Sequence, residues 1–341
     1  MKQDIFGRTL VEIQSICKEI KAPSYTAKQI CKWLYEKHVS EFSEMTNLSL
    51  HVRNQLNELY KIGKKSHTSV QLSKDLTKKY LFPVQHGFVE AAMIPNEDRS
   101  TLCLSTQVGC RYKCRFCATG EQGFHGDLSC SEILYQYAQL PERDKITNIV
   151  YMGMGEPMDN LENVLKSLEI FTAKYGYAKS PGRITVSTIG IIPGMEIFLQ
   201  KSKCHLAVSL HSPFAEERVS LMPIGKKYSL PQLIKTLKTY SFDKQKRLTF
   251  EYILFEGIND SRRHANALAR LLHGMKCRVN LLTFHPCVES DDLKPSNATT
   301  IAKFQQLLDS KGITTTIRKT RGQDIDAACG LLSTKALTKQ S

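Results

Sequence analysis

Three cysteines lie within eight residues of one another in the segment GCRYKCRFC, where they have the spacing C-x3-C-x2-C. Iron–sulfur clusters are held by cysteine thiolates, and a four-iron cluster normally takes four of them. Three thiolates would leave one iron free to bind a small molecule. The spacing therefore predicts a cluster that takes part in chemistry, with Cys110, Cys114 and Cys117 as its ligands.

A structural zinc site is the main alternative interpretation of these cysteines. Zinc in such sites takes four ligands, commonly as two C-x2-C pairs or as one pair with histidines. Only Cys114 and Cys117 form such a pair, and no second pair follows them. The chain has 11 cysteines in 341 residues, which is also too few for a disulfide scaffold. The pattern favours the iron–sulfur cluster.

The charge of the chain favours an anionic partner. The 47 Lys and Arg residues exceed the 33 Asp and Glu residues and give a net charge of +14. Binding to nucleic acid fits this excess, because each neutralised phosphate releases counterions. The first residues, MKQDIFGRTL, contain no apolar signal-peptide core, and no run of about 18 apolar residues predicts a membrane span. We expect a cytoplasmic protein without a membrane segment, in a compartment where thiols stay reduced.

The elements that must position the cysteines change in character along the chain. Residues 8–62 carry apolar residues at helical spacing and predict helices. Residues 70–94 predict a short hairpin and a further strand. From residue 100 onward strands and helices alternate, which predicts parallel strands joined by crossover helices. The expected strands are 101–105, 148–152, 183–187, 205–209, 248–254, 278–284 and 314–318.

This alternation predicts an α/β barrel, or an open part of one, as the main body of the protein. We expect four parts along the chain: a helical N-terminal domain (1–68), a connecting β segment (69–99), the barrel (100–331) and a C-terminal tail (332–341). In such barrels functional groups gather at the C-terminal ends of the strands.

The polar motifs of the chain follow the ends of the expected strands. The cysteine loop follows the first strand, and the segment GMGEP follows the second. Gly155 permits close approach of the backbone to a ligand, and Glu156 offers a carboxylate to an ammonium group. Ser187, Ser209 and His211 add neutral hydrogen-bonding groups after the next two strands. A lone histidine at a strand end is as often structural as ligand-binding, so both interpretations of His211 stay open.

Two further cysteines differ from the rest. Cys329 is flanked by small residues in the segment AACG, and this unobstructed setting suits a nucleophilic thiolate. Cys103 lies seven residues before Cys110. Buried cysteine is usually inert packing. We expect that role for Cys17, Cys31, Cys130, Cys204, Cys277 and Cys287.

The chain resembles the RlmN/Cfr family of radical S-adenosylmethionine (SAM) methyltransferases, which methylate an adenosine of 23S ribosomal RNA. The shared segments run in family order from about residue 88 to residue 331, and they include TLCLSTQVGC, CRFCATGEQGF, VYMGMGEP, TVSTIGIIP, VSLHSP, LMPI and TIRKTRGQDIDAACG. The helical N-terminal part is similar to the family's accessory domain in size and placement. The resemblance implies a partial (β/α)6-type radical SAM barrel with a small helical N-terminal accessory domain.

The resemblance also implies roles for matching residues. A [4Fe-4S] cluster on the three cysteines would chelate SAM through its free iron. Cys329 would accept a methyl group, Cys103 would be the resolving thiol, and Glu90 would be the proton acceptor. His285 stands where the family usually has Asn, and it would be a weaker contact. The SAM contacts would be Gly155, Glu156, Ser187, Ser209, Leu210, His211 and His285.

The reaction that the resemblance implies uses two SAM molecules per turnover. The Cys329 thiolate takes a methyl group from one, and the other is cleaved reductively to a 5′-deoxyadenosyl radical that removes a hydrogen from this methyl group. The resulting radical adds to the adenine, a base removes the ring proton, and Cys103 attacks the Cys329 sulfur to release the product. The target base must leave its stack to reach the site.

The resemblance implies several partners. They are 23S rRNA, with tRNA as a further substrate in some members, and a reducing system such as flavodoxin or ferredoxin. Cellular thiols would later reduce the disulfide that forms between the two reacting cysteines. No signal for an interface is visible in the sequence, and we expect a monomer.

The sequence leaves alternatives for the reaction open. The segments GEP and RKTRG match the RlmN branch, which methylates carbon 2, whereas STIGIIP and LHSP resemble the Cfr branch, which methylates carbon 8. We favour carbon 2 because RlmN is the housekeeping branch. An RNA-binding protein with a purely structural metal site is a third interpretation, and Cys103 and Cys329 argue against it because a passive binder would not need them.

Overall fold

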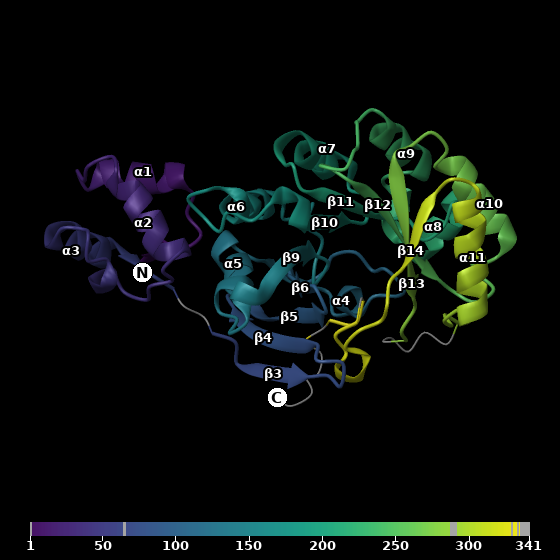
Figure 1. Cartoon of the computed structure of the whole chain (residues 1–341), viewed down its shortest axis with the longest axis horizontal. Coiled ribbons are helices and arrows are strands. Elements are labelled where there is room, and N and C mark those ends of the chain that lie inside the picture. The colour runs from purple at the N-terminus through teal and green to yellow at the C-terminus, as the bar shows by residue number, and fades with distance from the viewer. Residues whose placement is uncertain (1, 64–65, 287–291, 329, 333, 335–341) are drawn as a thin grey trace.

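The computed structural model describes residues 2–63, 66–286, 292–328, 330–332 and 334. Within these residues a ten-stranded sheet runs through the main body in the order β14-β13-β12-β11-β10-β9-β6-β5-β4-β3 (Figure 1). Its strands are β3 (Ser69–Leu72), β4 (Lys78–Val84), β5 (Gly87–Asn96), β6 (Arg99–Cys103), β9 (Ile146–Tyr151), β10 (Ile184–Thr188), β11 (His205–Ser209), β12 (Leu248–Leu254), β13 (Cys277–Thr283) and β14 (Thr314–Ile317).

Seven neighbouring strands of the described sheet, β6 and β9 to β14, pair in parallel. Six of them are each followed by helix, and β14 ends the series, so the predicted partial (β/α)6-type barrel is confirmed. Strands β3 to β5 extend the sheet in antiparallel fashion, as the hairpin prediction requires. The crossover helices are α5 (Cys130–Ala138), α6 (Leu161–Thr172), α7 (Ile192–Lys201), α8 (Ala215–Leu221), α9 (Leu230–Lys238), α10 (Arg262–Leu271) and α11 (Ala298–Ser310).

The parallel sheet turns an apolar face outward to these helices and a polar face inward. Along β12, Phe250 and Tyr252 are fully buried, while the alternating Thr249 and Glu251 line the inside. Closed barrels fill their interior with branched apolar side chains. The polar inner face therefore leaves an internal cavity, and the main hydrophobic core lies between the sheet and the outer helices.

The N-terminal helices lie at one side of the barrel, at the left in Figure 1. The helices predicted for residues 8–62 are present, and an SxxE-like capping box of Thr9 and Glu12 begins the first of them. None of the described helices is both long and apolar enough to cross a membrane. The N-terminal elements are β1 (Gln3–Asp4), α1 (Leu10–Glu19), α2 (Thr26–Tyr35), a 3-10 turn (Phe42–Glu44), α3 (Leu50–Leu59) and β2 (Tyr60–Lys61).

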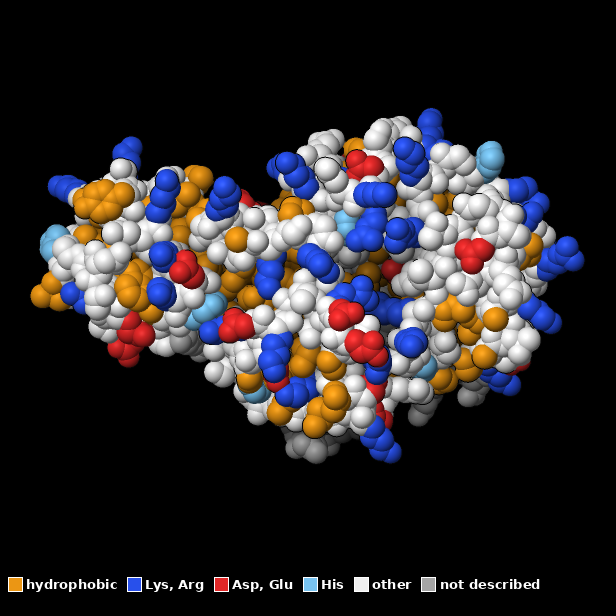
Figure 2. Space-filling model, in the orientation of Figure 1, with side chains coloured by type: hydrophobic (Ala, Val, Ile, Leu, Met, Phe, Trp, Pro, Cys, Tyr) orange, Lys and Arg blue, Asp and Glu red, His pale blue; other side chains and the backbone are white. Residues whose placement is uncertain are grey.

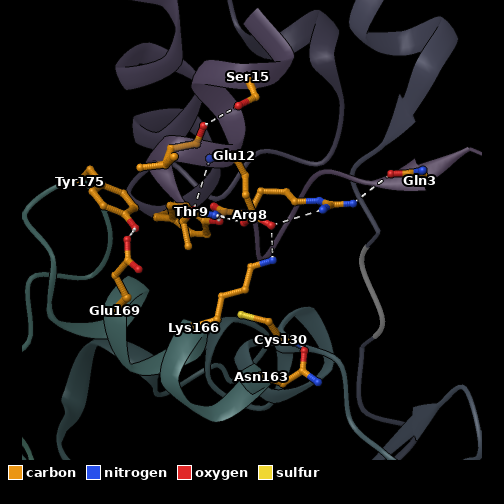
Figure 3. A network of polar contacts seen from close by, with 12 residues as sticks. Gln3, Arg8, Thr9, Glu12, Ser15, Cys130, Asn163, Lys166, Glu169 and Tyr175 are labelled. Atoms are coloured by element: carbon orange, nitrogen blue, oxygen red, sulfur yellow. Dashed lines mark hydrogen bonds and ion pairs between the residues drawn. The ribbon is translucent and has the colours of Figure 1, made fainter. Parts of the chain in front are cut away.

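A small polar network joins α1 to the barrel helix α6. Figure 3 shows Lys166 of α6 directed toward Glu12, and Lys166 Nζ lies 2.6 Å from Glu12 Oε1. Burial raises the pKa of Glu12, but hydrogen bonds from Lys166 and Thr9 and the charges of Lys166 and Arg8 outweigh it, so the pKa lies below 4.5. The ionised carboxylate is therefore the form that holds α1 against α6.

We predict that replacing Lys166 by Met lowers the free energy of unfolding by about 1 kcal/mol at neutral pH. A carboxylate whose pKa is lowered by folding contributes stability above its unfolded value, and this contribution is lost as the pH falls through the folded value. The difference between wild type and the variant should therefore disappear as the pH falls below 4.5. Chemical denaturation of both proteins at neutral pH and below pH 4.5 measures this difference in the free energy of unfolding.

Glu36→Gln is the control for this prediction. It removes the ion pair of Glu36 with Lys32, whose side chains are both 60% exposed, and should change stability little at either pH. A loss of stability in Lys166→Met that does not depend on pH would show that the Glu12 carboxylate does not secure this contact.

Candidate active site

A cavity of about 670 Å³ occupies the inside of the partial barrel. Most of the site residues predicted from the sequence are among the described residues that line this cavity: Cys103, Cys110, Cys114, Cys117, Gly155, Glu156, Ser187, Ser209, His211 and His285. Glu90 and Leu210 are buried but are not among the described lining residues. Cys329 lies outside the described residues, and its neighbours Ala328 and Gly330 line the cavity.

The cysteine loop connects β7 (Gln107–Gly109) to the short helix α4 (Ala118–Glu121). Gly109 has a φ of +71°, and a Cβ atom there would lie 1.7 Å from the carbonyl oxygen of Gly123, so the turn into the loop requires glycine. The N–H of Cys117 donates to the carbonyl of Cys114 over 3.1 Å. The backbone thus folds the three cysteines onto one part of the cavity wall.

The described residues contain no group of three or more His, Cys, Asp or Glu side chains that converges on a single ion. The ligands of a four-iron cluster differ in what they need, because each thiolate binds its own iron. The thiols are close enough to influence one another: burial, and then the charges of Cys117 and Cys110, raise the pKa of Cys114 well above its usual value. Bound metal is what would ionise such thiols.

A buried arginine beside the cysteine loop forms no ion pair with any residue that the structure describes. Arg218 of α8 is 1% exposed, and its Nη2 donates to the carbonyl of Ile189 over 2.7 Å. Among the described residues its Nε and Nη1 have no hydrogen-bond partner. Burial lowers its pKa to about 10, while the nearby Cys114 opposes this shift. Because an unpaired buried charge is costly, a negatively charged group at the cysteines fits this site.

The GMGEP segment packs closely against the chain that leads from the end of β6 into β7. Gly155 has a φ of +91°, and a Cβ atom there would lie 2.5 Å from Gln107 Cβ. A Cβ on Gly153 would lie 2.7 Å from the carbonyl oxygen of Leu104. The two glycines are thus explained by contacts within the fold, and they also bring the following carboxylate to the cavity wall.

Glu156 bridges two strand ends with its side chain. Its Oε1 accepts from the N–H of Met158 over 3.0 Å, and its Oε2 accepts from the N–H of Ile189 over 2.9 Å. Burial raises its pKa to about 7, although hydrogen bonds with Thr188, Ile189 and Met158 lower it. A cation bound in the cavity would restore the charged carboxylate.

His211 serves the fold and the cavity together. Its backbone is left-handed, with a φ of 55°, and the side chain of Asn259 donates to its carbonyl over 2.6 Å. Its Nδ1 accepts from the N–H of Ile253 over 3.0 Å, so the proton is on Nε2. Burial and the charge of Arg218 lower its pKa to about 3. The ring is therefore neutral. His211 lines the cavity, and its Nε2–H is the hydrogen-bond donor of the ring.

The remaining predicted SAM contacts differ in placement. Ser187 and Ser209 lie on the inner face of β10 and β11 and line the cavity. Leu210 is fully buried and does not line the cavity. His285 lines the cavity with its Nε2 2.9 Å from the Thr320 hydroxyl, which joins the chain after β13 to the chain after β14.

Cys103 lies at the end of β6, where it is 7% exposed and lines the cavity. It pairs with Ala92 of β5 in the sheet, so Ala92 and the alternate residue Glu90 share its face. Glu90 Oε1 lies 3.1 Å from Lys79 Nζ, and both side chains are nearly buried. Glu90 therefore lies on the inner face of the sheet, on β5, but it is not one of the described residues that line the cavity.

Sequence reasoning missed three groups that the structure brings to this site. Arg218 and Lys79 are charged residues whose burial no local pattern announces. Glu251 lines the cavity, and its Oε2 accepts from the side chain of Asn280 over 2.8 Å. Burial raises the pKa of Glu251. The alternation of polar and apolar residues along β12 and β13 was the sequence signal that could have placed Glu251 and Asn280 on the inner face of the sheet.

Comparisons with known proteins agree with this geometry. Residues 104–268 match the model of the Radical SAM superfamily, and residues 3–62 match the model described as the Ribosomal RNA large subunit methyltransferase N-terminal domain. The chain is 51% identical over 334 residues to a protein of Bacteroides fragilis named "Probable dual-specificity RNA methyltransferase RlmN", with 98% of this chain and 97% of the relative covered.

Two further relatives cover almost the whole chain. A "Dual-specificity RNA methyltransferase RlmN" of Syntrophus aciditrophicus is 44% identical, with 99% of this chain and 98% of the relative covered. The crystal structure of a radical SAM methyltransferase from Sphaerobacter thermophilus superposes with a TM-score of 0.89 at 35% identity, with 97% of this chain and 99% of that chain covered. The similarity thus extends over both the N-terminal helices and the barrel.

We predict that Arg218→Met separates the stability of the loaded protein from that of the apo protein. The substitution removes a buried unpaired cation, so the apo protein should lose less than about 1 kcal/mol of unfolding free energy. The protein reconstituted with iron and sulfide should lose about 2 kcal/mol or more and retain less iron, because the anionic cluster loses its partner. Anaerobic denaturation and iron analysis measure both effects.

Arg262→Met on the exposed start of α10 is the matched control, and it should leave iron content unchanged. Equal losses in the apo and reconstituted forms of Arg218→Met would contradict the interpretation of Arg218 as the cluster's counter-charge.

Proposed function

The chain belongs to the RlmN family of radical SAM RNA methyltransferases, and on this premise we propose that it methylates carbon 2 of an RNA adenosine through a methylated Cys329. The observation that carries the proposal is the meeting of distant segments at one cavity. Cys103, the three cluster cysteines and both described neighbours of Cys329 line it. A carrier thiol beside a resolving thiol is what this route needs.

The names of the relatives support the RNA substrates that we propose. The curated relatives are called dual-specificity RNA methyltransferases, and the N-terminal model is named for the large-subunit ribosomal RNA. We propose 23S rRNA as the main substrate and tRNA as a second. A non-catalytic RNA-binding protein with a structural metal is disfavoured by this family membership.

The cofactors are a [4Fe-4S] cluster and SAM, which together supply the radical chemistry when bound. We propose that Cys110, Cys114 and Cys117 ligate the cluster and that Arg218 balances its negative charge. Glu156 would hold the ammonium group of SAM, because its buried carboxylate is already fixed by two backbone N–H groups. Ser187, Ser209 and neutral His211 would bind uncharged or carboxylate groups, with His285 as a weaker contact.

The proton acceptor in this proposal is Glu90. Its carboxylate shares the face of Cys103, and its ion pair with Lys79 fixes it there. Base removal of the ring proton requires that the adenine reach toward β5 from the cavity.

We propose the same division of the chain as the sequence predicted. Residues 1–68 would form the accessory RNA-binding domain, 69–99 the connecting segment and 100–331 the barrel. Residues 332–341 would form the tail, most of which lies outside the described residues. A flavodoxin or ferredoxin system would supply electrons.

We predict that Glu156→Gln weakens SAM binding to the reconstituted protein by at least about tenfold, because a charge-assisted hydrogen bond to the ammonium group is lost. Equilibrium dialysis with labelled SAM measures it. Glu162→Gln, at the start of α6, is the control and should bind SAM like wild type. Wild-type affinity in Glu156→Gln would remove this residue from the SAM site.

We predict that Cys329→Ala abolishes methylation of RNA, while Cys277→Ala on β13 remains active. Mass spectrometry of digested 23S rRNA should detect 2-methyladenosine from wild type and from the control only. 8-Methyladenosine would assign the chain to the alternative carbon-8 reaction. Methylation by Cys329→Ala would contradict the covalent route.

A further inference from the structure

Four arginines gather at the end of the barrel opposite to the cysteine loop. Arg99 begins β6, Arg183 precedes β10, Arg247 precedes β12, and Arg278 is the second residue of β13. We call these four residues the arginine rim. Arg99, Arg247 and Arg278 line the cavity. Figure 2 shows Lys and Arg side chains gathered around a hollow in the middle of the molecular face that is in view.

The arginine rim has no acidic partner within the described chain. The ion pairs of the described residues all involve other side chains, although Glu97 and Asp98 lie in the turn before Arg99. Arg99 and Arg278 are exposed and form no side-chain hydrogen bond with a described residue. These guanidinium groups are therefore available to an external anion.

A buried histidine fixes the orientation of the innermost arginine. The backbone N–H of Arg247 donates to Nδ1 of His205 over 3.0 Å, and the Nε2 of this ring, which is 4% exposed, lies 3.0 Å from Nε of Arg247. Burial and the charge of Arg247 lower the pKa of His205 to about 4, so the ring is neutral. Burial, and then the charges of Arg278, Arg99 and Arg183, lower the pKa of Arg247, which shows that the rim charges repel one another.

The arginine rim and the cluster cysteines occupy opposite ends of the same cavity. The wall at the cysteine end includes the buried residues Glu156, Thr188 and His211, whereas Arg99 and Arg278 at the other end are exposed. The seven residues of β12 span about 20 Å at about 3.3 Å per residue. Lys319 and Thr320, which follow β14, also line the cavity and are exposed, so the cavity opens at both ends, and the rim is the opening farther from the reacting groups.

From this arrangement we propose that the arginine rim binds the phosphodiester backbone of a single-stranded RNA segment at its end of the barrel. Exposed guanidinium groups without acidic partners suit phosphates, which they bind through paired hydrogen bonds. The proposal rests on the proposed function, because it takes RNA as the substrate. It adds that nucleotides flanking the target adenosine are held at the ends of strands where no catalytic group lies.

An acidic electron-donor protein is the other partner that a cationic surface suits. Such a protein must deliver electrons to the cluster, whose cysteines lie at the far end of the strands. RNA is favoured because the rim lines the same cavity that the target base must enter.

The test compares the reconstituted wild type with two double variants of equal charge. Arg99→Gln with Arg278→Gln removes two rim charges, and Arg262→Gln with Arg270→Gln removes two exposed charges from α10. The probe is a fluorescein-labelled RNA stem–loop with unpaired adenosines in its loop. Fluorescence anisotropy over a range of salt concentrations gives the affinity and its salt dependence.

We expect the rim variant to bind about tenfold more weakly and to lower the slope of log K against log salt by about 1.5, with the α10 variant unchanged. Arg99→Lys with Arg278→Lys should restore most of the slope, because charge is kept. Cleavage of SAM without RNA, with dithionite as the chemical reductant, should be unchanged in every variant, which shows that folding and cluster loading are intact.

The outcomes separate the rim from the proposed function. If wild type methylates the RNA but the rim variant binds it like the α10 variant, the rim proposal fails alone. If the rim variant instead slows cluster reduction by flavodoxin at unchanged RNA affinity, the rim is a reductase surface and the RNA proposal is wrong. If wild type neither binds nor methylates RNA, both proposals fail.

Discussion

The parallel register of β6 and β9 to β14 is the constraint on which the rest of the site depends. Because all these strands point the same way, the loops that follow them meet at one end of the barrel. Residues as distant in sequence as those of the cysteine loop and Ala328 thereby reach one cavity. The same strand direction places the arginine rim at the other end of the barrel. The groups that we assign to RNA binding therefore lie at the opposite end of the strands from the groups that we assign to the reaction.

Charge compensation is what makes the interior depend on its ligands. Two nitrogen atoms of the buried Arg218 have no hydrogen-bond partner among the described residues, and burial holds the thiols of Cys110 and Cys114 and the carboxyl of Glu156 away from their charged forms. A charge on any of these buried groups is unfavourable without a partner. An anionic cluster and a cationic ligand together would supply the missing partners, so ligand binding and stability are linked here.

The sequence predicted those features that local spacing determines. The alternation of strands and helices predicted the seven parallel strands, and the position of the cysteine motif after the first of them predicted that its loop lies at the strand ends. It could not predict that Glu90 pairs with Lys79, because cross-strand partners depend on register across two strands. Nor could it predict that Arg218 is buried or that four arginines converge, since each lies in a different strand–helix unit. The sequence left both interpretations of His211 open, and it could not show the structural contact of this ring, because its hydrogen-bond partner Ile253 lies 42 residues farther along the chain.

The central claim is that one cavity holds the cluster, SAM and the carrier thiol together. The most direct measurement is a crystal structure of the anaerobically reconstituted protein with SAM. The account predicts the cluster on Cys110, Cys114 and Cys117, the SAM ammonium group at Glu156, and Cys329 facing the same cavity as Cys103. A single metal ion at these cysteines, or SAM bound away from Glu156, would contradict it.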